Sequence, residues 1–303
     1  MNAYLKHLLS MLLLSVAAAA QEPLKTRNLN EWLTVSGNFD ASYRETQFFK
    51  DGHDTSFFQW DTRLELWGPP YRNHFSWGPY LRLAGKISNR DEAFENGWLA
   101  EPGFGLQAYP FSFDHFRTPS NVLGKALGPL RAFVEYNIQD YWGDENRWRP
   151  DEQVRAGFDY YKALHVNSST KPWWVEMYGQ LTWESANEFD DDYNSLIFAN
   201  AIRAGARIPD AGLLSAFTPY VLAESTLTEN RSYAFENRLL LGGGIRFAPD
   251  MRLWPGRLDW ISRFVIFAEY LNAAAYYKAQ PPSGTPNHDF RVGIAVSVGD
   301  FYK

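Results

Sequence analysis

The sequence predicts an all-β fold, an antiparallel transmembrane outer-membrane β-barrel of about 12 strands. Three observations predict it. An export signal begins the chain, polar and apolar residues alternate along nearly all of the remaining residues, and aromatic side chains gather where the alternating segments end. Alternation with period two is typical of β-strands that separate two media, and aromatic girdles lie at the interfaces of membrane barrels.

The first twenty residues have the pattern of a secretory signal peptide. Lys6 precedes an apolar run at 8–17, and small residues lead up to Ala20, so we expect cleavage after Ala20. Residues 1–20 are then the signal peptide, 21–32 a short periplasmic lead and 33–303 the barrel. The apolar run is too short to span a bilayer, and no later segment reaches the roughly eighteen apolar residues of a membrane helix.

Alternation starts at once after the lead. In residues 33–45, Val35, Phe39 and Tyr43 lie on one face and Asn38 and Asp40 on the other, as in a strand between lipid and water. The same pattern recurs in residues 58–66, 81–87, 104–108, 130–139, 154–160, 173–184, 202–208, 220–227, 235–247, 264–270 and 290–298. It is weaker at 104–108 than in the other segments. These segments give about twelve strands of roughly ten residues, the length that a tilted strand needs to cross a bilayer.

The connections differ in charge according to strand parity. Those that leave odd strands are acidic or polar, at 50–54, 89–97, 143–152, 187–192 and 228–232, whereas those that leave even strands are more apolar or basic. An even strand number brings both ends of the barrel to the periplasmic side, so we expect the acidic connections outside the cell. The run of three aspartates at 190–192 lacks the alternating ligands and turn glycine of a calcium loop, which favours a solvated outer loop.

A soluble β-sandwich would also alternate, with its polar face in bulk solvent. The strands are too many for one sandwich, no linker divides them, and GIAVSV at 293–298 is similar to the terminal strand signal of outer-membrane barrels. In a barrel the polar face must be the lumen, because an arginine turned toward lipid at mid-membrane costs about 2–4 kcal/mol. We therefore expect a protein of the Gram-negative outer membrane, with lipid, lipopolysaccharide and the barrel-assembly machinery as partners.

The amino-acid composition excludes some classes of protein and some kinds of partner. The chain has no cysteine, so neither disulfides nor a lipid-modified cysteine is expected. Its formal net charge of -6 speaks against a nucleic-acid partner. We expect no cofactor.

The predicted lumen carries mixed charges, and we expect these pore-lining residues: Arg44, Asp61, Arg63, Glu65, Arg82, Lys86, Glu135, Arg155, Asp159, Glu176, Glu184, Arg203, Arg207, Glu224, Arg238, Arg246, Glu269 and Arg291. They have two interpretations. Buried charges must be paired, so they could form a network that fills the barrel. They could also line a polar conduit, because about twelve strands lie between the eight that leave no space and the sixteen of an open channel. In a conduit, Glu135 and Glu269 are the carboxylates expected to influence ion selectivity.

An outer-membrane lipid hydrolase is the enzymatic alternative. It needs a histidine and a serine on one face near the outer rim. His53, Asp54 and Ser56 are close in sequence, but they lie around one connection, and proximity in sequence does not make a triad. We expect no enzyme. A small general porin or a structural barrel explains the alternation as well as a dedicated conduit does.

Four segments resemble the C-terminal barrel of the phage-adsorption protein A family of outer-membrane proteins: FVEYN at 133–137, NRWRP at 146–150, WWVEMYG at 173–179 and FAEYL at 267–271. The resemblance implies a barrel associated with export of surface exopolysaccharide, which phages use as a receptor. Members of that family carry a long helical-repeat periplasmic region ahead of the barrel, whereas only residues 21–32 precede the first strand here. A separate periplasmic helical-repeat protein of a polysaccharide synthase would then be the partner.

Overall fold

The computed structural model describes residues 34–48, 54–67, 76–88, 97–111, 127, 129–142, 151–166, 170–188, 191–229, 237–249, 261–276 and 286–298. The predicted signal peptide 1–20 and lead 21–32 lie outside these residues. Most of the acidic connections, including His53 and the segments around 89–97 and 143–152, also lie outside them.

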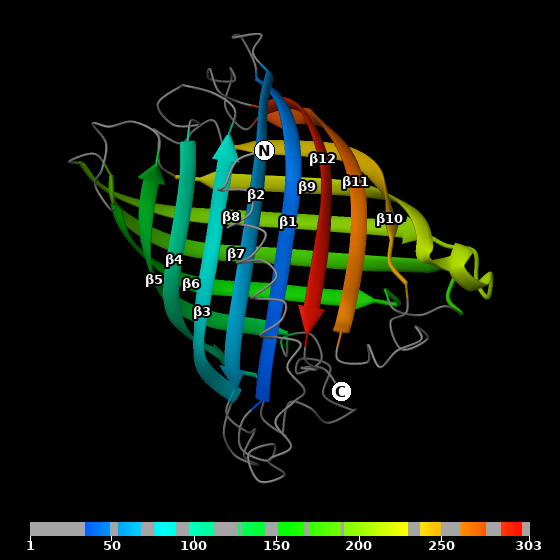
Figure 1. Ribbon diagram of the computed structural model, residues 1–303, viewed down its shortest axis with the longest axis horizontal. Helices are drawn as coiled ribbons and strands as arrows, with labels where there is room; N and C mark the ends of the chain where they lie inside the picture. The colour runs from blue at the N-terminus through cyan, green and yellow to red at the C-terminus, as the bar shows by residue number, and fades with distance from the viewer. Residues whose placement is uncertain are drawn as a thin grey trace, which may run out of the picture.

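The described chain forms a closed antiparallel barrel of twelve strands, which confirms the predicted fold (Figure 1). Each strand pairs with its neighbours in sequence, and the last strand pairs with the first. The strands are β1 (Thr34–Phe48), β2 (Asp54–Trp67), β3 (Ser76–Ser88), β4 (Gly97–Tyr109), β5 (Leu130–Trp142), β6 (Asp151–Leu164), β7 (Trp173–Glu188), β8 (Asp191–Ala206), β9 (Phe217–Thr228), β10 (Arg238–Phe247), β11 (Ile261–Tyr276) and β12 (Pro286–Val298).

Most strands are longer than the alternation predicted. The largest difference is β8, which begins at Asp191 although we expected its strand from residue 202 and a loop at 187–192. Asn187 pairs with Asp192 and Glu188 with Asp191, so these four residues of the acidic segment belong to paired strands. The pattern is weak there because Ile197 and Phe198 are consecutive apolar residues and polar residues occupy both faces near the tip.

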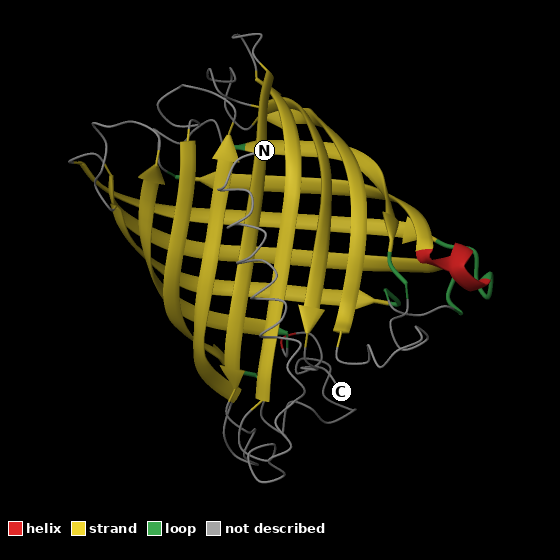
Figure 2. Cartoon of the chain, in the orientation of Figure 1, coloured by secondary structure: helices red, strands yellow, loops and turns green. Residues whose placement is uncertain are grey.

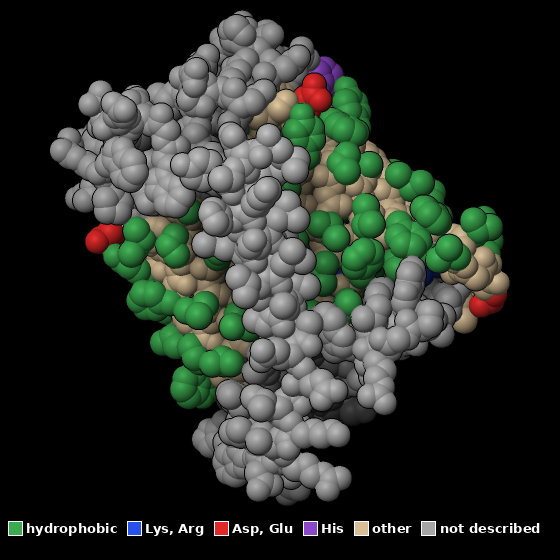
Figure 3. Space-filling view, viewed as in Figure 1, with side chains coloured by type: hydrophobic (Ala, Val, Ile, Leu, Met, Phe, Trp, Pro, Cys, Tyr) green, Lys and Arg blue, Asp and Glu red, His purple; other side chains and the backbone are tan. Residues whose placement is uncertain are grey.

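Apolar side chains cover the outside of the barrel. Leu81, Phe104 and Val221 are 60%, 61% and 65% exposed, and hydrophobic side chains dominate the described part of the face in Figure 3. The described residues include one short 3-10 helix, η1 (Gly212–Ala216), between β8 and β9 (Figure 2). None of the helices in the described part of the chain could span a bilayer.

The lumen is not polar throughout. Trp174, Tyr220, Leu222, Leu240 and Leu271 are buried against one another in a cluster that also includes Val166. Leu240 and its neighbour Leu241 lie on opposite faces, with 1% and 46% exposure respectively. Along β7 to β11 an apolar cluster therefore fills part of the barrel.

Candidate functional site: the charged lumen

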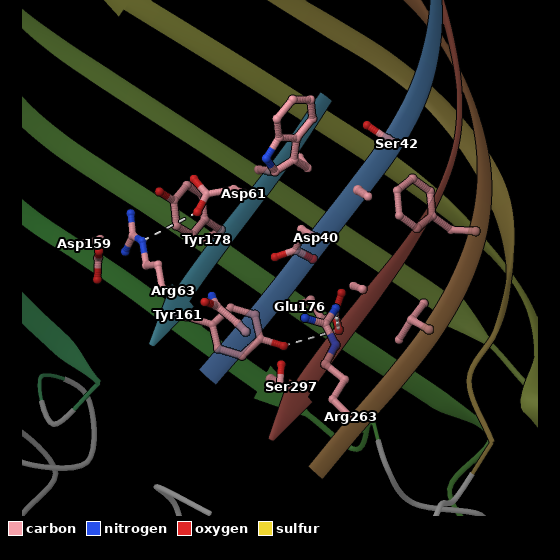
Figure 4. A pocket seen from close by; sticks show the side chains of 18 of the residues that line it. Asp40, Ser42, Asp61, Arg63, Asp159, Tyr161, Glu176, Tyr178, Arg263 and Ser297 are labelled. Carbon is pink, nitrogen blue, oxygen red and sulfur yellow. Dashed lines mark hydrogen bonds and ion pairs between the residues drawn. The ribbon is translucent and has the colours of Figure 1, made fainter. Parts of the chain in front are cut away.

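The barrel encloses a cavity of about 1120 Å³. Its wall combines polar residues of β1 and β2, such as Asp40 and Asp61, with Arg263 of β11 and with residues of β7 on the opposite side, such as Glu176 and Tyr178 (Figure 4). The lining is mostly charged or hydrogen-bonding, as a water-filled passage requires. How these charges are paired decides what the cavity can conduct.

Glu135 is the centre of the network on β3 to β7. Its carboxylate is 1% exposed and accepts hydrogen bonds from the Tyr80 hydroxyl at 2.8 Å, the Asn137 amide at 2.8 Å and one guanidinium nitrogen each of Arg82 and Arg155 at 3.3 Å. So many donors satisfy the buried charge that its desolvation cost is offset. This carboxylate is therefore held against the barrel wall.

The arginines around Glu135 continue the network along the wall. Arg82 lies 2.7 Å from Asp61 and 3.8 Å from Glu101, while Arg155 lies 3.4 Å from Glu184. Arg131 pairs with Asp159 and, at 3.1 Å, with Glu65. Arg63 also lies 3.8 Å from Asp61. One half of the lumen is thus lined by linked ion pairs.

Glu269 has the corresponding role on β8 to β12. It accepts hydrogen bonds from the Tyr220 hydroxyl at 2.7 Å and Arg203 Nε at 2.9 Å, and Arg291 Nη1 lies 3.8 Å from it. Arg291 also pairs with Glu224 at 2.7 Å and Asp289 at 2.6 Å. A third group joins Glu176 to Arg246 and Arg263, each at 3.1 Å.

Glu135 and Glu269 occupy equivalent places in an internal repeat. From β2 to β6, the register pairs join Glu65 to Tyr80, Tyr80 to Gly105, Gly105 to Glu135 and Glu135 to Arg155. From β8 to β12, the same steps join Gly205 to Tyr220, Tyr220 to Gly244, Gly244 to Glu269 and Glu269 to Arg291. The barrel therefore contains two runs of five strands with matching register.

The glycines of the repeat make room for the tyrosines. A Cβ atom at Gly105 would overlap the ring of Tyr80, and one at Gly244 would crowd the ring of Tyr220. Each tyrosine can therefore lie across the neighbouring strand and reach the carboxylate one strand further, as its hydroxyl bond to Glu135 or Glu269 shows. Glycine is required here for close approach, not for an unusual backbone conformation.

The two runs differ in the residues around this shared core. Arg82, Glu101 and Asn137 in the first run stand at the register positions of Leu222, Leu240 and Leu271 in the second. The apolar lumen cluster thus replaces part of the charged network of the other half. Charged networks line both sides of the lumen, but the apolar cluster lies on the side of β7 to β11.

The structure places the predicted pore-lining residues in three ways. Eleven line the cavity, namely Asp61, Arg63, Glu65, Arg82, Lys86, Asp159, Glu176, Arg203, Arg246, Glu269 and Arg291. Six belong to lumen-facing strand positions but do not line it, namely Arg44, Glu135, Arg155, Glu184, Glu224 and Arg238.

Arg207 is the exception and is a correction. It follows the end of β8, where its guanidinium donates to the Val166 carbonyl at 2.7 Å, so it lies at the rim of the barrel. Burial lowers the pKa of this arginine.

The cavity lining also includes residues that were not predicted as site residues, namely Asp40, Glu101, Arg131 and Arg263. Each of them alternates with apolar neighbours or stands on a lumen-facing strand position.

The described histidines form no hydrolase site with serine. His165 contacts the ring of Trp173 edge-on. His288 lies 2.9 Å from the Tyr270 hydroxyl and also contacts Asn272. Neither histidine has a serine partner in the described part of the chain, and the described residues contain no group of three metal-ligating side chains.

No family model matches the sequence, and no curated protein matches it. Solved structures with similar folds are the β domain of the Bordetella autotransporter BrkA (11% identity, TM-score 0.44, covering 87% of this chain and 98% of that one) and the translocator domain of the autotransporter NalP from Neisseria meningitidis (11% identity, TM-score 0.42, 93% and 96%). The NanC porin is a third (9% identity, TM-score 0.35, 85% and 98%).

The closed antiparallel barrel, its apolar exterior and its charged interior define an integral outer-membrane β-barrel. This class belongs to the bacterial outer membrane, and its members include porins and autotransporter translocator domains.

Proposed function

We propose that this barrel is a polar conduit through the outer membrane and that its cargo is surface exopolysaccharide. The observation that carries the conduit is the way the lumen charges are paired. Glu135 and Glu269 bond to groups on neighbouring strands and lie against the wall, while a cavity of about 1120 Å³ remains between the networks. A plug would need side chains that close this space.

The cargo is inferred from two further features. The segments FVEYN and FAEYL resemble the phage-adsorption protein A family, with its association with exopolysaccharide export, and both contain a central glutamate of the lumen network. The cavity also presents Tyr161 and Tyr178 beside carboxylates and arginines. Aromatic faces and charged hydrogen-bonding groups together suit a chain of sugar rings, which offers apolar ring faces and hydroxyl groups.

This proposal includes export through a cleaved signal peptide and a separate helical-repeat protein in the periplasm that delivers the polymer. It assigns no catalytic step to the chain. Use of the barrel as a phage receptor would follow from its surface position.

Two measurements test the proposal. The purified barrel in planar bilayers should show stable single-channel conductance, and deletion of the gene should reduce surface polysaccharide, with complementation restoring it. A barrel that folds but does not conduct would contradict the conduit. Conductance together with unchanged surface polysaccharide would support the second candidate, a small general porin, which the mixture of both charge signs in the cavity favours.

A further inference from the structure

Among the described lumen carboxylates, Asp40 differs in having no cation within ion-pair distance, although Arg63, Arg203 and Arg263 act on it at longer range. It stands on β1, lines the cavity and is exposed to it. Figure 4 shows its carboxylate projecting into the space between Asp61 and Glu176. Among the side chains that the structure describes, no hydrogen bond or ion pair reaches this carboxylate.

Every other described carboxylate on the lumen face lies within ion-pair distance of an arginine. They are Asp61, Glu65, Glu101, Glu135, Asp159, Glu176, Glu184, Glu224, Glu269 and Asp289. A paired charge acts at a distance as a dipole, whose potential falls off faster than that of a single charge. The charge of Asp40 is balanced only by arginines at longer range, so an ion in the cavity meets it less closely compensated than the other carboxylates.

The strand register explains why no arginine lies within ion-pair distance of Asp40. Its strand partners are Asp61 on β2 and Ala295 on β12. The carboxylate of Asp61 repels that of Asp40. Arg82 donates its hydrogen bond to Asp61 and not to Asp40. Ala295 offers no polar group. Carboxylates that face a narrow aqueous passage favour cations over anions.

From these observations we propose that Asp40 shifts the ion selectivity of the lumen toward cations. The inference rests on the proposed conduit and identifies a residue that influences what passes. It also replaces the expectation that Glu135 and Glu269 would supply the selecting charges, because both are almost fully buried in arginine networks.

The test is the reversal potential of the purified barrel in planar bilayers under a potassium chloride gradient. For Asp40→Asn, which changes charge with little change in volume, the ratio of potassium to chloride permeability should fall by about three-fold, the effect of one screened unit charge a few ångströms from the ion. Asp40→Glu should keep the wild-type ratio. Glu45→Gln is the matched control, because Glu45 lies on the same strand with the opposite parity and is also exposed.

A second measurement uses the absence of native cysteine. Asp40→Cys should react with a water-soluble thiol reagent added to the open channel, and a cationic reagent should lower potassium conductance more than an anionic one. Conductance with an unchanged permeability ratio in Asp40→Asn, or an Asp40→Cys barrel whose thiol the reagents do not reach, would overturn the role of Asp40 and leave the conduit standing. A folded barrel without any conductance would overturn both.

Discussion

Replacing Arg82 by leucine should destabilise the barrel strongly, because this guanidinium neutralises three carboxylates at once. Arg82 has an 11% exposed side chain and lies 2.7 Å from Asp61, 3.3 Å from Glu135 and 3.8 Å from Glu101. Removing one partner of a buried ion pair costs about 3–5 kcal/mol. Asp61 is 36% exposed and Glu135 keeps Arg155, Tyr80 and Asn137 as donors, so we expect a loss near the lower end, about 3 kcal/mol.

The internal repeat supplies a compensating variant. The second run carries Leu222 at the position of Arg82, Ala201 at that of Asp61 and Leu240 at that of Glu101. The triple variant Asp61→Ala, Arg82→Leu and Glu101→Leu removes Arg82 together with two of the carboxylates that it neutralises. Because apolar groups of suitable shape often replace a buried ionic cluster without loss, we expect it to recover most of the lost stability.

The assay is reversible urea unfolding of the barrel in lipid vesicles, followed by tryptophan fluorescence. The free energy of unfolding should decrease in the order wild type, triple variant, single variant. A single variant that loses less than about 1 kcal/mol would show that Arg82 is not a required neutralising group. A triple variant less stable than the single variant would refute the equivalence of the two runs.

Three further predictions concern the faces and the orientation of the barrel. Leu240→Ala should cost about 2–5 kcal/mol in the same unfolding assay because it opens the lumen cluster, whereas Leu241→Ala, on the lipid face, should cost much less; equal losses would contradict the assigned faces. Phe104→Arg should reduce the folded barrel recovered from membranes, since an arginine on the lipid face costs about 2–4 kcal/mol at mid-membrane, while Phe104→Tyr should assemble normally. In intact cells, a membrane-impermeant thiol reagent should label Asp191→Cys and not Asp210→Cys, and the opposite result would invert the barrel.

The sequence was sufficient for the fold because alternation reports which face each residue occupies. It was weaker where alternation fails. The run Leu239, Leu240 and Leu241 carries no period of its own. The parity of the predicted pore residues Arg238 and Arg246 places Leu240 inside, but the pattern could not show that it packs there in an apolar cluster. In the same way, the predicted strand at β8 is too short because the first half of β8 alternates poorly.

Cross-barrel partners could not be predicted from the pattern at all. Period two places Arg82 and Glu135 on the lumen face, but only the register and the strand tilt bring them within 3.3 Å. The sequence does carry one signal of the repeat. FVEYN and FAEYL share a Phe-x-Glu-Tyr pattern around Glu135 and Glu269, and the wider repeat becomes evident only when the strand pairs are aligned.

The seam between β1 and β12 has a consequence for the order in which the chain folds. At the seam, Arg44 of β1 pairs with Asp289 of β12, which also accepts a hydrogen bond from Thr46. β1 is synthesised first, yet its arginine gains this fully buried partner only when the last strand arrives. Contacts of such long sequence separation form slowly, since chain entropy must be lost before they are made. Closure of the barrel is therefore a late step, and until it occurs the edge of β1 remains open to any other strand that the membrane presents.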